Sequence, residues 1–123
     1  MSDSHANDML VVLRHSPHGS SWLREGLEAA LVAAAFGRGV SLLFSGEGVM
    51  ALLDSQQPGP LGQKGTQPML EMLPMYDIDA FWVDVDTLRS LGLKQDDLIF
   101  PVAEMAREAF PDFFQQHQLI LNF

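Results

Sequence analysis

The chain has 123 residues, 47% of them hydrophobic, which predicts one domain with a substantial buried core. Seven Lys and Arg against sixteen Asp and Glu give a formal net charge of -9, which argues against direct binding of nucleic acid. The absence of cysteine excludes disulfides, thiolate metal ligands and cysteine nucleophiles, and no apolar run approaches the roughly 20 residues of a membrane span.

The first eight residues are polar and lack the basic and apolar regions of a secretory signal. We therefore expect a cytoplasmic protein with a flexible N-terminal arm over 1–8. The rest, 9–123, is predicted to form a single α/β domain. Within it, Gly, Pro and Gln dominate 54–68, and a segment of this length and composition predicts a mobile loop.

The segment 9–44 has the pattern of one β-α-β unit. An apolar run predicts a strand over 9–14, a turn follows at Ser16-Pro17-His18-Gly19, and a second apolar run predicts a strand over 40–44. Runs without polar alternation are typical of strands covered on both faces, as in a parallel sheet between helices. Ser20 or Ser21 is expected to cap the intervening helix, and Gly37 to end it.

That helix carries two apolar stripes. The first is expected to cover the sheet and consists of Leu23, Leu27, Ala30, Leu31 and Ala34. The second combines small and aromatic residues: Trp22, Gly26, Ala29, Ala33 and Phe36. A helix that is apolar on two faces is seldom left in water, so we expect another subunit to cover the second stripe.

A glycine pattern follows the second strand. Gly46-x-Gly48-x-x-Ala51 formally matches a dinucleotide-binding fingerprint, but that motif belongs after the first strand of its unit and needs an acidic residue about twenty positions later. We interpret it as a tight turn leading into a short helix, and we assign no cofactor.

The segment 69–76 contains three methionines, two leucines and a tyrosine, and it predicts a short helix. Methionine fills cores and also adapts to partner surfaces. We favour a core position for the segment and keep Met72, Met75 and Tyr76 as candidate interface residues.

The C-terminal third predicts three further strands. The first covers 80–83 and ends at Asp84, and Asp86 is expected to cap a helix over 87–91. A strand over 98–100, a helix over 102–110 ended by Pro111, and a last strand over 118–123 complete the chain. The predicted architecture is a three-layer α/β domain with a mostly parallel five-stranded sheet flanked by helices.

Polar side chains at the carboxyl ends of these strands form a candidate crevice, where ligands bind in open α/β sheets. Its residues are His15, Ser16, His18, Ser45, Glu47 and Asp84. A catalytic triad of Ser16, His18 and Asp84 lacks a nucleophile elbow, and a zinc site of His15, His18 and Asp84 lacks regular spacing. A phosphoacceptor site would need an acidic residue where Arg14 and His15 follow the first strand.

We therefore interpret the crevice residues as turn and edge residues, with no catalytic or metal-binding residue assigned. A small-molecule-binding or hydrolytic enzyme that uses His15, His18 and Asp84 remains the alternative, since histidine is the commonest general base.

An ordered set of short segments resembles the DsrE/DsrF family across nearly the whole chain. They are Ser16-Pro17-His18-Gly19, Arg24-Glu25-Gly26-Leu27, Gly48-Val49, Leu73-Pro74-Met75-Tyr76-Asp77-Ile78, Phe81-Trp82-Val83, Leu88-Arg89-Ser90-Leu91-Gly92-Leu93 and Ile120-Leu121-Asn122-Phe123. Within this family the chain is most similar to the DsrF-like subunits.

The resemblance implies a subunit of a sulfur-relay heterohexamer. Its sister subunits would be TusB-like and TusD-like chains, its acceptor a TusE-like protein, and its pathway the 2-thiolation of the wobble uridine in tRNA. Sulfur oxidation is the alternative pathway for DsrF-type subunits. In TusD-like chains the persulfide cysteine follows the third strand, and the matching position here is Asp84. A carboxylate cannot hold a persulfide, so the resemblance implies a non-catalytic subunit.

Overall fold

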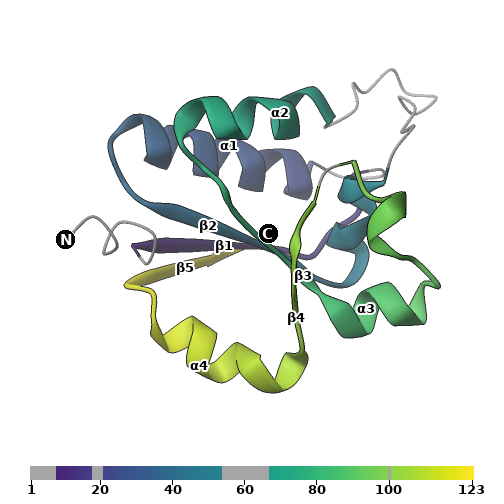
Figure 1. Ribbon diagram of the computed structural model, residues 1–123. Coiled ribbons are helices and arrows are strands. Elements are labelled where there is room, and N and C mark those ends of the chain that lie inside the picture. Colours follow the sequence, from purple (N-terminus) through teal and green to yellow (C-terminus); the bar gives the residue numbers. More distant parts are fainter. Residues whose placement is uncertain (1–7, 18–20, 54–66, 100) are drawn as a thin grey trace.

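A computed structural model describes residues 8–17, 21–53, 67–99 and 101–123. Its five strands form one sheet in the order β4-β3-β2-β1-β5 (Figure 1). The strands are β1 Met9–Leu13, β2 Val40–Phe44, β3 Ala80–Asp84, β4 Ala103–Met105 and β5 Leu119–Asn122. All four pairings are parallel, so the predicted five-stranded α/β fold is confirmed. Residues 1–7 and 54–66 of the predicted arm and loop lie outside the described residues, whereas Gln67 already begins a helix.

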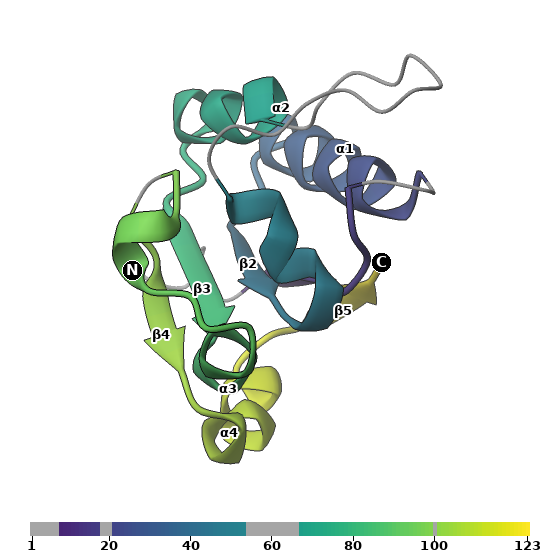
Figure 2. The same ribbon diagram turned by 90° about the vertical axis from the view of Figure 1, so that its right-hand side faces the viewer.

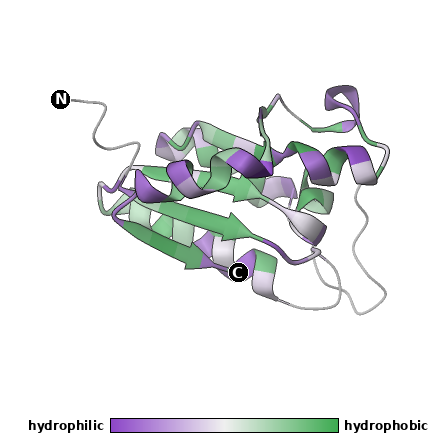
Figure 3. Cartoon of the chain, turned by 90° about the horizontal axis from the view of Figure 1, so that it is seen from below, coloured by the Kyte–Doolittle hydropathy of each residue, from purple (hydrophilic) through white to green (hydrophobic). Residues whose placement is uncertain are grey.

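The central strand is β2, and all ten residues of β2 and of its neighbour β1 are buried. Their register pairs Met9 with Val40 and Leu13 with Phe44. Figure 3 shows the strands as almost continuously hydrophobic, whereas the helices mix hydrophobic and hydrophilic residues. A strand can be apolar on both faces only if both faces are covered, so the apolar runs, interrupted only by the buried Ser41 in β2, reflect the layers above and below the sheet.

Helices lie on both sides of the sheet, as Figure 2 shows, with α1 and α2 above it and α4 below it. On one face lie α1 Trp22–Ala35 and α2 Gln67–Met72, together with the 3-10 helices η2 Gly46–Leu52 and η3 Leu73–Tyr76. On the other face lies α4 Phe110–Gln115, and α3 Val85–Ser90 follows the carboxyl end of β3. The remaining 3-10 helices are η4 Gln95–Asp97 and η5 Arg107–Ala109.

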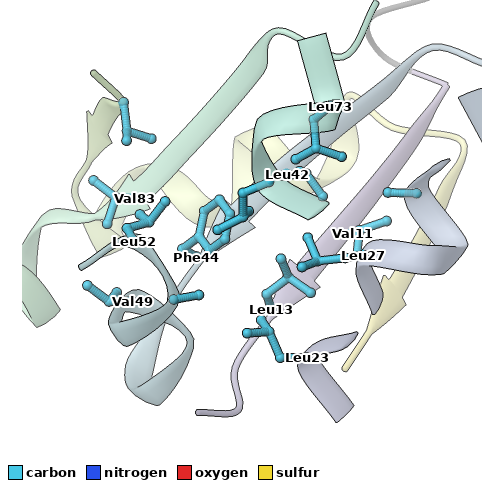
Figure 4. Packing of buried hydrophobic residues seen from close by; sticks show 14 of the residues in the cluster. Val11, Leu13, Leu23, Leu27, Leu42, Phe44, Val49, Leu52, Leu73 and Val83 are labelled. Carbon is cyan, nitrogen blue, oxygen red and sulfur yellow. The ribbon is translucent and has the colours of Figure 1, made fainter. Parts of the chain in front are cut away.

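The larger hydrophobic core fills the space between the sheet and the first helical layer (Figure 4). Leu23 and Leu27 of α1 pack with Val11, Leu13 and strand residues of β2, and all are fully buried. A smaller cluster on the other face is built from Leu10, Val12, Leu43, Met105 and Phe113. Complete burial of one such side chain contributes about 1.5–3 kcal/mol, so most of the stability resides in these two clusters.

The glycine turn after β2 has a packing reason. A Cβ atom on Gly48 would lie 2.0 Å from the carbonyl oxygen of Leu13, a distance that no side chain tolerates. Gly46 has a φ of 55°, in the left-handed region. The backbone of this turn therefore requires both glycines. This requirement explains the Gly46-x-Gly48 pattern without a cofactor.

The predicted elements around Pro111 are wrong. The segment 102–110 contains β4 and η5 rather than one helix, and Pro111 lies in the first turn of α4 instead of ending a helix. Proline has no N–H to donate and has a helical φ, so it suits a first helical turn. The strand predicted at 98–100 is also wrong, because Leu98 forms only an isolated antiparallel bridge with Leu53.

Two smaller predictions are corrected as well. The cap of α3 is Asp84 rather than Asp86, since Asp84 accepts hydrogen bonds from the backbone N–H groups of Asp86 and Thr87. In the methionine-rich segment, Leu70 and Leu73 form the core. Met72 and Met75 are 39% and 80% exposed, so the core position favoured for the segment holds for its leucines and not for these two candidate interface residues.

Candidate functional site

Asp84 is the central polar residue at the carboxyl edge of the sheet. It is the last residue of β3 and is fully buried. Its Oδ1 accepts hydrogen bonds from the backbone N–H of Asp86 at 3.0 Å and of Thr87 at 3.3 Å. These two bonds satisfy donors that a helix leaves unpaired at its start, so Asp84 joins β3 to α3.

The second carboxylate oxygen of Asp84 binds three side chains from three different segments. Oδ2 accepts from the Ser45 hydroxyl at 3.0 Å, the Thr87 hydroxyl at 3.0 Å and the Arg107 Nε at 2.9 Å. Arg107 is 62% exposed, so an exposed guanidinium compensates a buried carboxylate. We call Ser45, Asp84, Thr87 and Arg107 the Asp84 cluster.

The cluster keeps Asp84 ionised. Burial alone would raise the pKa of this carboxyl, but the hydrogen bonds from Arg107, Thr87 and Ser45 outweigh it and lower the pKa below its ordinary value. The pKa of Arg107 is raised in turn by its hydrogen bond and charge interaction with Asp84. A carboxylate with five donors has no acceptor site left for a metal ion or a substrate proton, so its present arrangement is structural.

The structure brings together only part of the predicted crevice. Ser45 and Asp84 are in direct contact. His15 is exposed and instead stacks on Trp22, with ring centroids 5.4 Å apart and planes 21° from parallel. Glu47 is exposed and Ser16 half-buried, and His18 lies outside the described residues. Within the part of the chain that the structure describes, no group of three metal-ligating residues could hold an ion.

The sequence analysis missed Thr87 and Arg107. Thr87 has a local signal, since it lies three residues after Asp84 in the pattern of a helix start. Arg107 lies 23 residues away from Asp84 on η5 and has no such signal, because only the pairing of β4 with β3 brings it there.

The candidate interface residues lie in different parts of the fold, and one of them is buried. Phe36 directly follows α1, Met72 is the last residue of α2, and Met75 and Tyr76 lie on η3; we call these four exposed residues the aromatic-methionine patch. Trp22 is 49% exposed at the opposite end of α1. Gly26 is the exception, because it is buried and its Cβ would lie 2.5 Å from the Leu13 side chain and 3.0 Å from that of Phe123. Its assignment to the interface is corrected: it lets α1 approach the sheet.

Ala29 and Ala33 line a shallow apolar groove of about 540 Å³ between α1 and β5. Val32 lies beside them, and Leu119, Leu121 and Phe123 form the opposite wall. We call it the α1–β5 groove. Among the described residues, no helix is long and apolar enough to cross a membrane.

The model of the DsrE/DsrF-like family matches residues 7–123. A "Protein TusC homolog" of Vibrio parahaemolyticus is 33% identical over 95% of this chain and 99% of its own length. A "Protein TusC homolog" of Pseudomonas aeruginosa is 32% identical over 95% of this chain and 98% of its own. The "Intracellular sulfur oxidation protein DsrF" of Allochromatium vinosum is 37% identical over 70% of this chain and 63% of its own.

Among solved structures, the YchN protein from E. coli has a TM-score of 0.80 at 21% identity and covers 95% of this chain and 99% of its own. This likeness shows the fold alone. It agrees with the five-stranded parallel sheet between helices described above.

Proposed function

Since the chain belongs to the DsrE/DsrF-like family, we propose that it is a non-catalytic subunit of a sulfur-relay complex. The observation that carries this proposal is the Asp84 cluster at the end of β3. The resemblance implies that the sulfur-carrying cysteine of TusD-like chains would match this position. Here a buried carboxylate with five hydrogen-bond donors stands there, and a carboxylate forms no persulfide.

The exposed apolar surface supports the role of an assembly subunit. Phe36 and Met75 are 83% and 80% exposed, which is unusual for large apolar side chains of a chain that works alone. Aromatic residues and methionine are enriched in protein interfaces. The aromatic-methionine patch therefore supplies the contact with TusB-like and TusD-like sister chains in a cytoplasmic heterohexamer.

We further propose that the complex passes sulfur to a TusE-like acceptor for 2-thiolation of the wobble uridine in tRNA. The near full-length similarity to two TusC homologs favours this pathway. The net charge of -9 is compatible with it, because this subunit has no need to touch the tRNA. The similarity to a DsrF protein supports sulfur oxidation as the second candidate.

Co-expression with the sister chains of the same genome tests the assembly role. A tagged chain should retain both sister chains on affinity purification, and Phe36→Asp with Met75→Asp should lose them. Leu91→Asp is the matched control, since Leu91 is also an exposed apolar residue, 48% exposed, but follows α3. Retention of both sister chains by the double variant would contradict the role of the patch.

Transfer of radioactive sulfur tests the non-catalytic role. The complete complex should transfer persulfide sulfur to the acceptor, and this chain alone should neither accept nor transfer it. If the isolated chain becomes labelled and passes the label to the acceptor, the non-catalytic assignment is wrong. A strain without this chain should lose 2-thiolation of tRNA if the first pathway is correct and sulfur oxidation by the cell if the second is, so measuring both separates the two pathways.

A further inference from the structure

The two edges of the sheet differ in how they are protected. β4, at one edge, has three residues, carries the charged Glu104, and is covered by Gln95, whose side chain bonds to Val102 and Glu104. Short strands, charges and covering side chains are the usual protection against pairing with another chain. β5, at the other edge, has no charge and no proline in Leu119–Asn122. Among the residues that the structure describes, this edge therefore lacks the protection that β4 has.

The hydrogen bonds of β5 show which of its backbone groups are available. The N–H of Phe123 donates to the Val12 carbonyl at 2.9 Å, and the carbonyl of Phe123 accepts from Arg14 at 2.7 Å. Alternate residues of a strand direct their backbone groups to opposite sides, so Leu121 also faces β1. The backbone groups of Ile120 and Asn122 consequently point to the open edge, where no other described strand lies (Figure 2).

The α1–β5 groove lies directly beside this edge and has opposite charges at its two ends. Arg38 lies at the end near Leu119, because the Met9 N–H bonds to the Gly39 carbonyl at 3.0 Å and Met9 is in register with Leu119. Glu25 lies at the end near Phe123, because its neighbour Gly26 packs on Phe123. A partner that fits the groove must present these charges in the reverse order.

We propose that two copies of this chain pair antiparallel through β5, so that their sheets join into one. With Leu121 on the two-fold axis, Ile120 of each copy stands opposite Asn122 of the other, and each such pair exchanges two hydrogen bonds. The same register puts Arg38 of one copy near Glu25 of the other, at both ends of the interface. The partner at the β5 edge is a second copy of this chain, because a two-fold related copy presents its Glu25 and Arg38 in the reverse order along the groove.

This inference does not rest on the sulfur-relay role, although a complex with two copies of each subunit would accommodate it. Apolar side chains of the two grooves meet across the axis, with Leu121 against Leu121 and Leu119 against Phe123. The β5 edge and the α1–β5 groove share no residue with the aromatic-methionine patch. Sister chains and the second copy can therefore bind to this chain at the same time.

Sedimentation equilibrium of the purified full chain tests the pairing. The native chain should be a dimer, and Asn122→Pro should raise its dissociation constant by at least about a hundredfold, because proline removes an outward N–H and obstructs the edge. Asn122→Ala is the matched control, which keeps the N–H and should stay dimeric. Circular dichroism and thermal unfolding check that the proline variant remains folded.

Charge reversal at two surface side chains provides a second test, with thermal unfolding as the check that each variant remains folded. Arg38→Glu and Glu25→Arg should each raise the dissociation constant about tenfold, because each places two like charges opposite each other at both ends of the interface. The double variant should restore the native dissociation constant, because it again places opposite charges there. A monomer at every concentration would overturn the proposal, as would a dimer that neither Asn122→Pro nor Arg38→Glu weakens. Single variants that weaken the dimer without rescue by the double variant would overturn the two-fold geometry.

Discussion

The Nε atom of Arg107 lies 2.9 Å from Oδ2 of Asp84 and joins η5 to the carboxyl end of β3. The carboxylate is buried and the guanidinium is largely exposed, so the pair is a buried charge neutralised from the surface. The backbone N–H of Arg107 also donates to Asp86 Oδ2 at 3.2 Å. This double attachment holds the segment after β4 against the start of α3, and the predictions on the Asp84 cluster follow from it.

Asp84→Asn should destabilise the fold by about 2–4 kcal/mol. The amide can accept fewer of the five hydrogen bonds, and its NH₂ group would face the donors of Ser45 and Arg107. Urea unfolding followed by circular dichroism measures the change. The control is Asp79→Asn, an exposed position that should be neutral. A stability loss no larger than that of the control would contradict the structural role of Asp84.

The contribution of Asp84 should depend on pH in a defined direction. Its folded pKa is lowered from the ordinary 3.8, so the stability that its ionisation supplies is present above about 3.8 and is lost as the pH falls through the folded pKa. The difference in unfolding free energy between the native chain and Asp84→Asn should therefore be constant near neutral pH and shrink in acid. Unfolding curves over a pH series measure it, and a difference that grows in acid would reverse the sign assigned here.

Gly48→Ala should destabilise the chain by about 1–3 kcal/mol or prevent folding, because the added Cβ would lie 2.0 Å from a backbone carbonyl oxygen that cannot rotate away. Gly37→Ala is the matched comparison. It has a φ of 91° but no atom within 4 Å of the new Cβ, so it should cost only about 1 kcal/mol from backbone strain. Thermal unfolding of both variants checks the order, and equal losses would rule out the steric explanation.

Leu27→Ala should cost about 2–5 kcal/mol, because Leu27 is fully buried between α1 and the sheet and the substitution leaves a cavity. Leu91→Ala, at a residue that is 48% exposed, should cost much less. Denaturant midpoints for the two variants test whether the face of α1 assigned to the core is correct.

The central β-α-β unit was predictable because its signals are local. The run Val40–Phe44, apolar except for the buried Ser41, required a strand covered on both sides, and Gly37 marked the end of α1. The part after Leu98 was not predictable in the same way. A three-residue edge strand such as β4 has too few residues for a pattern, and Pro111 has the same local signature at the start of a helix as after its end.

The candidate site shows the same division. Residue types and their order were enough to predict that an acidic residue ends β3, that no thiol can stand there, and that α1 has more apolar surface than one sheet face needs. The contact of Arg107 with Asp84, the position of Gly26 against the sheet and the stacking of His15 on Trp22 became visible in the folded chain alone. The reason is that residue type and short-range periodicity are written along the chain, whereas contacts between distant segments depend on the strand order β4-β3-β2-β1-β5.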